Sequence, residues 1–204
     1  MRRRASCNPW RRERRCPRVR DRVFWRNLAV YFCVFSVAGH WMEIAYCSFM
    51  DLFGIVDEDS LVWADPLYPF LVYGVGVAVC AIVLVPLKER LLARRRTRRG
   101  AGAEFYLIAV VACLVMELVM GLLLNQPNEL GEYPLWDNSV LPLNVLGQAW
   151  LVNDLALGAV AMLYTWAVYP LCERALAKVP ARVMDAVALA TVAGFAVLCA
   201  VKFS

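Results

Sequence analysis

The sequence is poor in the residues from which metal sites and common catalytic motifs are built. It contains a single histidine, and its eight cysteines form no C-x-x-C pair, so a zinc site is not expected. It also lacks a G-x-x-x-x-G-K-[ST] phosphate loop and an H-E-x-x-H motif. These absences exclude a P-loop ATPase, and they lead us to expect no catalytic residue, no metal and no cofactor.

Lys and Arg are missing from two long stretches, residues 27–87 and residues 100–173. Half of the 22 basic residues lie instead in residues 1–26. A nucleic-acid-binding protein places its basic residues on a folded polar surface. Here they bracket apolar blocks, which is typical of membrane topology. We therefore expect no nucleic-acid partner, in spite of the formal net charge of +5.

Apolar residues are in excess, at 61% of the chain with a mean hydropathy of +0.55, against about 45–50% in soluble domains. A bilayer is crossed by about 20 apolar residues, and five segments satisfy that length: about 24–50, 67–87, 104–124, 149–171 and 183–201. Because backbone inside a bilayer must satisfy its own hydrogen bonds, residues 23–204 are predicted to form an all-α, polytopic membrane helix bundle. Residues 1–22 are expected to form a disordered, Arg-rich cytoplasmic tail that contacts anionic lipids.

The loops between the predicted spans alternate in charge. Loops 51–66 and 125–148 contain acidic residues and no base, whereas loops 88–103 and 172–182 are basic. Basic loops stay in the cytoplasm, so five spans give an N-in/C-out protein of the bacterial cytoplasmic membrane. A cleaved signal peptide is the alternative for the first segment. Its length and the lack of a clear cleavage site favour an uncleaved span.

Five of the polar residues inside the predicted spans are candidates for a shared site, and they are His40, Glu43, Glu117, Asn153 and Asp154. A carboxylate at the bilayer centre costs about 2.5–3.5 kcal/mol, so such residues face the bundle interior or a cavity. The predicted orientation puts all three carboxyls in the outer half of the membrane. We interpret them as one outward-facing polar site, in which a carboxyl is protonated or a cation or cationic substrate binds. The alternative is a structural cluster of interhelical hydrogen bonds.

The outer loop 125–148 contains three prolines and the sequence Trp136-Asp137-Asn138-Ser139. A proline-broken segment between two spans can dip into the membrane and cover a site. The alternative is an interfacial loop anchored by Trp136 and Trp150. In the last span Ala186, Ala190 and Gly194 form a stripe on which a neighbouring helix could pack. We find no internal repeat by inspection.

Four short elements occur in order along residues 30–175: G-H-W-M-E at 39–43, Y-G-V-G at 73–76, E-L-V-M-G at 117–121 and L-W-D-N-S-x-x-P-x-N-x-x-G at 135–147. They resemble elements of a bacterial family of putative ABC-transporter permeases, the CmpB-like type IV group. The chain departs from that pattern at His40, Asn138 and Gln148, where the family has Trp, Tyr and Arg.

The resemblance implies a permease-like membrane subunit of a transport system, with any ATPase on a separate subunit. It also adds Trp41, Tyr73, Trp136, Asp137 and Asn144 to the candidate substrate- or ion-binding residues. A non-catalytic scaffold or accessory protein that packs with other membrane proteins is the first alternative. A less favoured one is an intramembrane enzyme acting on a lipid or cell-envelope substrate, with Glu43 or Glu117 as base and His40 as acid or ligand.

Overall fold

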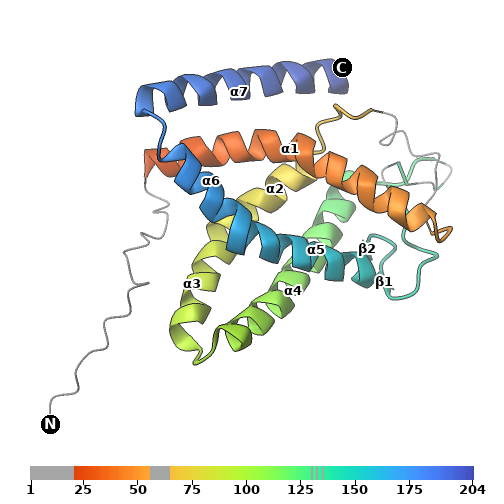
Figure 1. The fold of residues 1–204 in the computed structure, drawn as a ribbon. Coiled ribbons are helices and arrows are strands. Elements are labelled where there is room, and N and C mark those ends of the chain that lie inside the picture. The colour runs from red at the N-terminus through yellow and green to blue at the C-terminus, as the bar shows by residue number, and fades with distance from the viewer. Residues whose placement is uncertain (1–20, 56–64, 130, 132, 135) are drawn as a thin grey trace, which may run out of the picture.

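The computed structural model describes residues 21–204 except 56–64, 130, 132 and 135 (Figure 1), so almost all of the predicted tail lies outside the described residues. Within the described part, five helical segments are long and apolar enough to cross a membrane: Arg22–Asp51, Leu71–Arg94, Arg98–Leu124, Leu151–Leu176 and Ala181–Phe203. The predicted all-α bundle of five membrane helices is confirmed. The first, third and fifth segments are the single helices α1, α4 and α7.

The second and fourth segments each contain a π-helical turn. The second is built from α2 (Leu71–Val79), η2 (Cys80–Leu84) and α3 (Val85–Arg94), and the fourth from α5 (Leu151–Leu163), η3 (Tyr164–Val168) and α6 (Tyr169–Leu176). Pro86 and Pro170 follow the two π turns closely. A proline has no N–H and its ring clashes with the carbonyl four residues earlier, so the helix widens just ahead of it.

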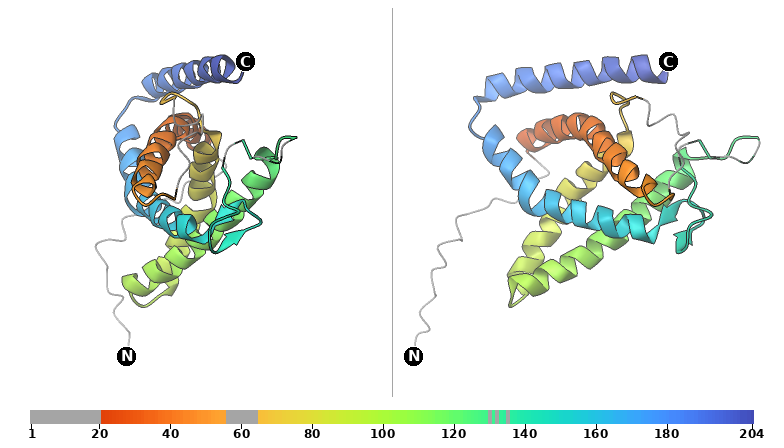
Figure 2. Two further views of the ribbon diagram at one scale, coloured as in Figure 1. Left: turned by 90° about the vertical axis from the view of Figure 1, so that its right-hand side faces the viewer. Right: turned by 45° about the vertical axis from the view of Figure 1, so that its right-hand side comes forward.

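The helices associate as two hairpins and one added helix. The first hairpin packs α1 against α2, and the second packs α4 against α5. Helix α7 runs beside α1, on the side away from α4 in Figures 1 and 2, and buries only Met184 and Ala188 of its own residues. The two hairpins therefore form the body of the bundle, with α7 on its flank.

The basic loop predicted at 88–103 is mostly helical. Helix α3 ends at Arg94 and α4 begins at Arg98, so three residues form the turn, and the hydroxyl of Thr97 accepts a hydrogen bond from the Gly100 N–H at 3.1 Å. Hydropathy marks only the apolar part of a span, whereas a helix continues into the headgroup layer on residues whose charged ends reach water. This accounts for the difference from the sequence-based boundaries.

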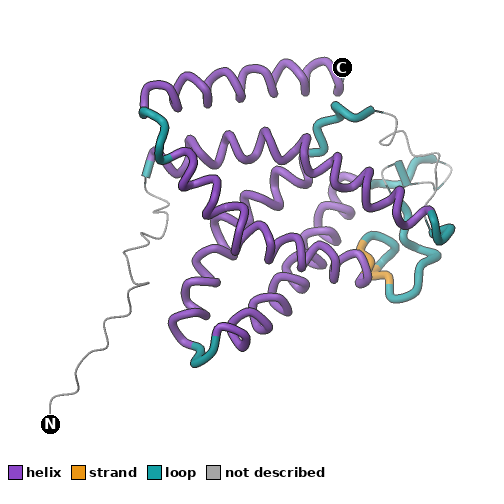
Figure 3. Tube along the Cα trace, in the orientation of Figure 1, coloured by secondary structure: helices purple, strands orange, loops and turns teal. Residues whose placement is uncertain are grey.

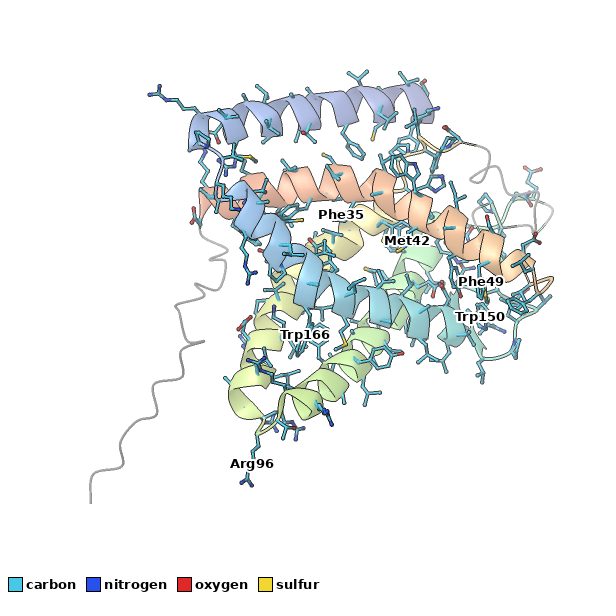
Figure 4. The ribbon with its side chains drawn as sticks, in the orientation of Figure 1. Phe35, Met42, Phe49, Arg96, Trp150 and Trp166 are labelled. Carbon is cyan, nitrogen blue, oxygen red and sulfur yellow. The ribbon has the colours of Figure 1, made fainter. Side chains whose placement is uncertain are left out.

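Ion pairs join the ends of the helices. Arg26 near the start of α1 pairs with Asp185 near the start of α7 at 3.1 Å, and Lys202 at the end of α7 pairs with Asp65 at 2.6 Å. Arg96, at the α3–α4 turn, lies at the opposite end of the bundle from Trp150 (Figure 4). The described parts of the two base-free loops and the C-terminus thus share one end of the bundle.

Candidate functional site

A carboxyl cluster lies between α4 and the start of α5. Glu117 of α4 accepts two hydrogen bonds, one from the side-chain amide of Asn153 at 2.9 Å and one from the backbone N–H of Trp150 at 3.4 Å. Trp150 directly precedes α5, and Asn153 lies in its first turn. The hairpin α4–α5 therefore surrounds its own carboxylate with donors.

Asp154 is the most deeply buried acid of the cluster, with no exposed surface. It lies close enough to Glu117 for the two carboxyls to share a proton in a hydrogen bond. Without that proton, neither of its oxygens has a hydrogen-bond partner among the described residues. A buried charge without a partner costs several kcal/mol, so this pair favours taking up a proton.

Glu43 of α1 borders a small cavity of about 50 Å³, which is lined by Glu43, Tyr46, Tyr73 and Asn153 together with apolar side chains. The hydroxyl of Tyr73 donates a hydrogen bond to Glu43. The second carboxyl oxygen of Glu43 is buried without a partner among the described residues. Because Asn153 both lines this cavity and binds Glu117, it connects the two glutamates.

His40 and Trp41 contact the segment that precedes α2. His40 is fully buried, its Nε2 lies 3.0 Å from the backbone oxygen of Asp65, and its ring packs against Tyr68 and Phe70. The indole of Trp41 donates to the carbonyl of Pro66. These contacts bind the described end of the loop to α1, and in the part of the chain that the structure describes neither His40 nor Trp41 hydrogen-bonds to the carboxyl cluster. No group of three or more His, Cys, Asp or Glu in the described part of the chain is arranged to hold a metal ion.

The described residues between 125 and 150 form a cap that is tied to the end of α4. The side-chain amide of Asn125 donates to the carbonyl of Trp136 at 2.6 Å and to Gln148 Oε1 at 3.0 Å, and the Trp136 indole donates to the Gln148 carbonyl at 2.8 Å. Gln148 is 2% exposed and packs on Gly121, where an added Cβ would come within 2.6 Å of its oxygen. The glycine therefore lets the cap settle on α4, one turn above Glu117.

Two strands of two residues, β1 (Asn144–Val145) and β2 (Ala149–Trp150), pair in antiparallel fashion within this cap (Figure 3). Asn144 supports the turn between them, because it donates to the carbonyl of Leu141 at 2.7 Å and accepts from the N–H of Gly147 at 3.0 Å. Asp137 is exposed and accepts from the N–H of Ser139 at 2.8 Å. Among the predicted site residues, Trp136, Asp137 and Asn144 thus shape the cap.

The tip of the cap is apolar and strained. Val140, Leu143 and Leu146 are exposed, and both leucines have positive φ angles, of 65° and 56°. Branched residues rarely adopt this conformation, and such strain concentrates at functional segments. The Trp150 indole holds the tip by donating to the Pro142 carbonyl at 2.9 Å. An exposed apolar tip at the end of a membrane bundle suits the interfacial layer.

Two features that matter here were not predicted from the sequence: the polar pair that holds the cap, and the π turns. Asn125 and Gln148 fix the cap over Glu117, but a polar residue at a helix end carries no distinct signal. Gln148 was noticed only as a departure from the family pattern. The π turns were also missed, although Pro86 and Pro170 inside apolar spans were available signals.

The comparisons with known proteins give one match. A family model described as putative ABC-transporter type IV matches residues 30–203. The match covers the five helical segments almost entirely and includes the carboxyl cluster and the cap. No curated protein and no solved structure matches the chain.

Proposed function

Because the chain belongs to the putative ABC-transporter type IV family, we propose that it is a permease-like subunit of a transport system. The proposal places a polar site in the outer half of the bacterial cytoplasmic membrane, beneath the cap. One observation carries it: polar residues from three helices meet, because Glu43 and Asn153 line one cavity and Glu117 contacts Asn153 and Asp154. Polar groups inside a membrane are costly, and they are typical of substrate and ion pathways.

The orientation is part of the proposal. The basic segments, so far as the structure describes them, lie at the end of the bundle that holds Arg26 and Asp185. Basic loops favour the cytoplasm. The cluster and the cap then face outward. Reporter fusions test this: a C-terminal alkaline phosphatase should be active, and a C-terminal fluorescent protein should be dark. The reverse result would turn the site toward the cytoplasm.

The ATPase of such a system is a separate subunit, because this sequence contains no phosphate-binding loop. Purification of the full chain in mild detergent should recover a protein with a P-loop. When the two are reconstituted together in liposomes, we expect Glu117→Gln to lower ATPase activity by about tenfold or more, as for loss of hydrogen bonds to a charged group. Glu43→Gln should lower it as well, because an amide cannot bind and release a proton.

The matched control is Glu129→Gln, which changes an exposed glutamate of the outer loop in the same way. It should leave the activity unchanged. Failure to recover any ATPase from membranes of the native host would contradict the transport proposal. So would full activity in the double variant Glu43→Gln, Glu117→Gln.

A specific feature of α7 favours the second candidate function, an accessory role in a membrane complex. Ala186, Ala190 and Gly194 are exposed, and a Cβ added at Gly194 would meet nothing within 4 Å. A small-residue stripe allows close approach of another helix. Replacing Ala190 by Trp should then release a co-purifying membrane protein without unfolding the chain.

A further inference from the structure

The second and fourth helical segments share a sequence that inspection of the chain missed. Residues 86–93 and 170–177 both read P-L-x-E-R-x-L-A. Gly74 and Gly158 precede these stretches at the same distance, as do Leu71 and Leu155. Six matches in eight positions, with two further matches at constant spacing, indicate a repeated helix.

The structure repeats at the same positions. η2 (Cys80–Leu84) and η3 (Tyr164–Val168) are offset by the spacing that separates Gly74 from Gly158. π turns are rare, so their recurrence at equivalent positions supports the repeat independently of residue identity. Each turn lies in the second helix of a hairpin, and both hairpins run in the same direction through the bundle (Figure 1).

The first helices of the two hairpins correspond as well. When Glu43 is aligned with Glu117, Met42 falls on Met116, and Ala29, Val37 and Ala38 fall on Ala103, Val111 and Ala112. This alignment also pairs Ser36 with Val110. Ser36 is the residue that a Cβ on Gly74 would strike first, and Val110 is the one that a Cβ on Gly158 would strike first. The helix–helix contact itself is therefore repeated.

We propose that the chain consists of two parallel copies of one helical hairpin, and that Glu43 and Glu117, the equivalent carboxyls, form a proton-binding pair in which Glu43 carries the proton. This inference rests on the proposed function: the polar site is the same one, and the ion that it binds is a proton. Parallel repeats in membrane proteins place their ligand sites at the interface between the repeats. The cavity between Glu43 and Asn153 occupies that position.

The two carboxyls differ in their partners. Glu117 accepts N–H groups from Asn153 and Trp150, which stabilise its ionised form. Glu43 accepts only the Tyr73 hydroxyl, and its other oxygen is buried without a partner among the described residues. A proton on that oxygen removes the unpaired charge.

Among the described residues, the groups that face the two carboxyls include no Lys, Arg or His. Around Glu43 they are Tyr73 of α2 with Tyr46 and Cys47 of α1, and behind Glu117 lie Cys113 of α4 and Asp154 of α5. A cavity of about 50 Å³ has room for one or two water molecules, and most of its lining is apolar. No group of three or more His, Cys, Asp or Glu in the described part of the chain is arranged to hold a metal ion, whereas a proton needs a single carboxyl, so a proton fits this site best.

The test is an infrared pH titration of the full-length protein in liposomes, which follows the C=O stretching band of protonated carboxyls. Exposed carboxyls have pKa values of about 4, so a band that persists at neutral pH reports buried protonated groups. We expect the wild type to show this band and Glu43→Gln to lose part of it. The part that remains belongs to Asp154, and Glu129→Gln should change nothing.

Two further variants keep Glu43 and should move the pH midpoint of its band in opposite directions. Glu117→Gln removes the negative charge of the equivalent carboxyl, which Asn153 connects to the cavity, and should lower the midpoint. Tyr73→Phe removes the donor to the carboxylate and should raise it. A purely structural role for these residues would not produce opposite shifts, and both variants stay informative if Glu43→Gln does not fold.

The proposal is overturned if the wild type has no protonated-carboxyl band at neutral pH, or if Glu43→Gln leaves the band unchanged. It is also overturned if NaCl in place of choline chloride abolishes the band, since the site would then bind Na⁺. Recovery of an ATPase is a separate measurement. A missing band with the ATPase present would reject the proton pair alone, and a band without any ATPase would reject the transport role alone.

Discussion

Replacing Gly158 by alanine tests the contact between α4 and α5 directly. An added Cβ would lie 2.5 Å from Val110 Cγ2, 3.1 Å from the Val110 nitrogen and 3.2 Å from its Cα. The valine side chain can rotate, but the backbone atoms cannot, so the two helices must separate by a few tenths of an ångström. Overpacking of this kind costs about 1–3 kcal/mol, and alanine regains about 1 kcal/mol of helix propensity.

The net expected loss is up to about 2 kcal/mol of the free energy of unfolding, which at that limit is roughly a thirtyfold change in the folding equilibrium. It can be measured from tryptophan fluorescence as the purified protein is unfolded in mixed micelles of increasing SDS content. Gly194→Ala is the matched control, because its Cβ meets nothing within 4 Å and α7 is exposed there. We expect that variant to be neutral or slightly more stable.

Gly74→Ala extends the test to the equivalent position of the first hairpin. Its added Cβ would meet only side chains, Ser36 and Phe32, which can move more easily than backbone. The loss should therefore have the same sign as for Gly158→Ala and a smaller size. Equal SDS midpoints for Gly158→Ala and Gly194→Ala would refute the close packing of α4 on α5.

Two other predictions concern ion pairs and buried charge. Lys88 is 4% exposed and donates to the Thr165 carbonyl at 3.0 Å, so Lys88→Met should leave that carbonyl unsatisfied and cost about 1–3 kcal/mol in the same SDS titration, whereas an unchanged midpoint would exclude this role. The hydrogen bond from Lys202 holds the pKa of Asp65 below its ordinary value of 3.8. This contact is therefore complete above that value and is lost as the pH falls through the lowered pKa, so a spin label near the end of α7 should gain mobility only in acid, and Asp65→Asn should show that mobility already at neutral pH.

The fold was predictable because membrane spans are marked by long-range features. Stretches without bases and with sufficient apolar length located all five segments. The systematic error was at the turn between the second and third segments, where α3 continues to Arg94 and α4 already begins at Arg98. These features are sums over about 20 residues, so single residues hardly alter them.

The site was only partly predictable, because residue contacts depend on helix rotation and loop path. Matching depths grouped Glu43, Glu117 and Asp154, which the structure brings together around Asn153. The depth of a residue along its span does not specify the direction in which its side chain points, so it could not show that His40 faces the Asp65 backbone. The repeat is hard to see in the sequence because no single offset aligns both helices of one copy with those of the other. The loops between the first and second helices differ in length, so each pair of helices has its own offset.

The repeat also explains why the two glutamates differ. The positions equivalent to Asn153 and Asp154 in the first copy are Pro69 and Phe70, which are buried and offer the site no polar side chain. The second copy thus surrounds its glutamate with an amide and another acid, while the first copy leaves Glu43 facing the cavity with the Tyr73 hydroxyl alone. Two identical hairpins would share a proton equally between equivalent carboxyls. Divergence at these two positions favours the charge on Glu117 of the second copy and the proton on Glu43 of the first. The two sides of the interface between the copies therefore differ in charge.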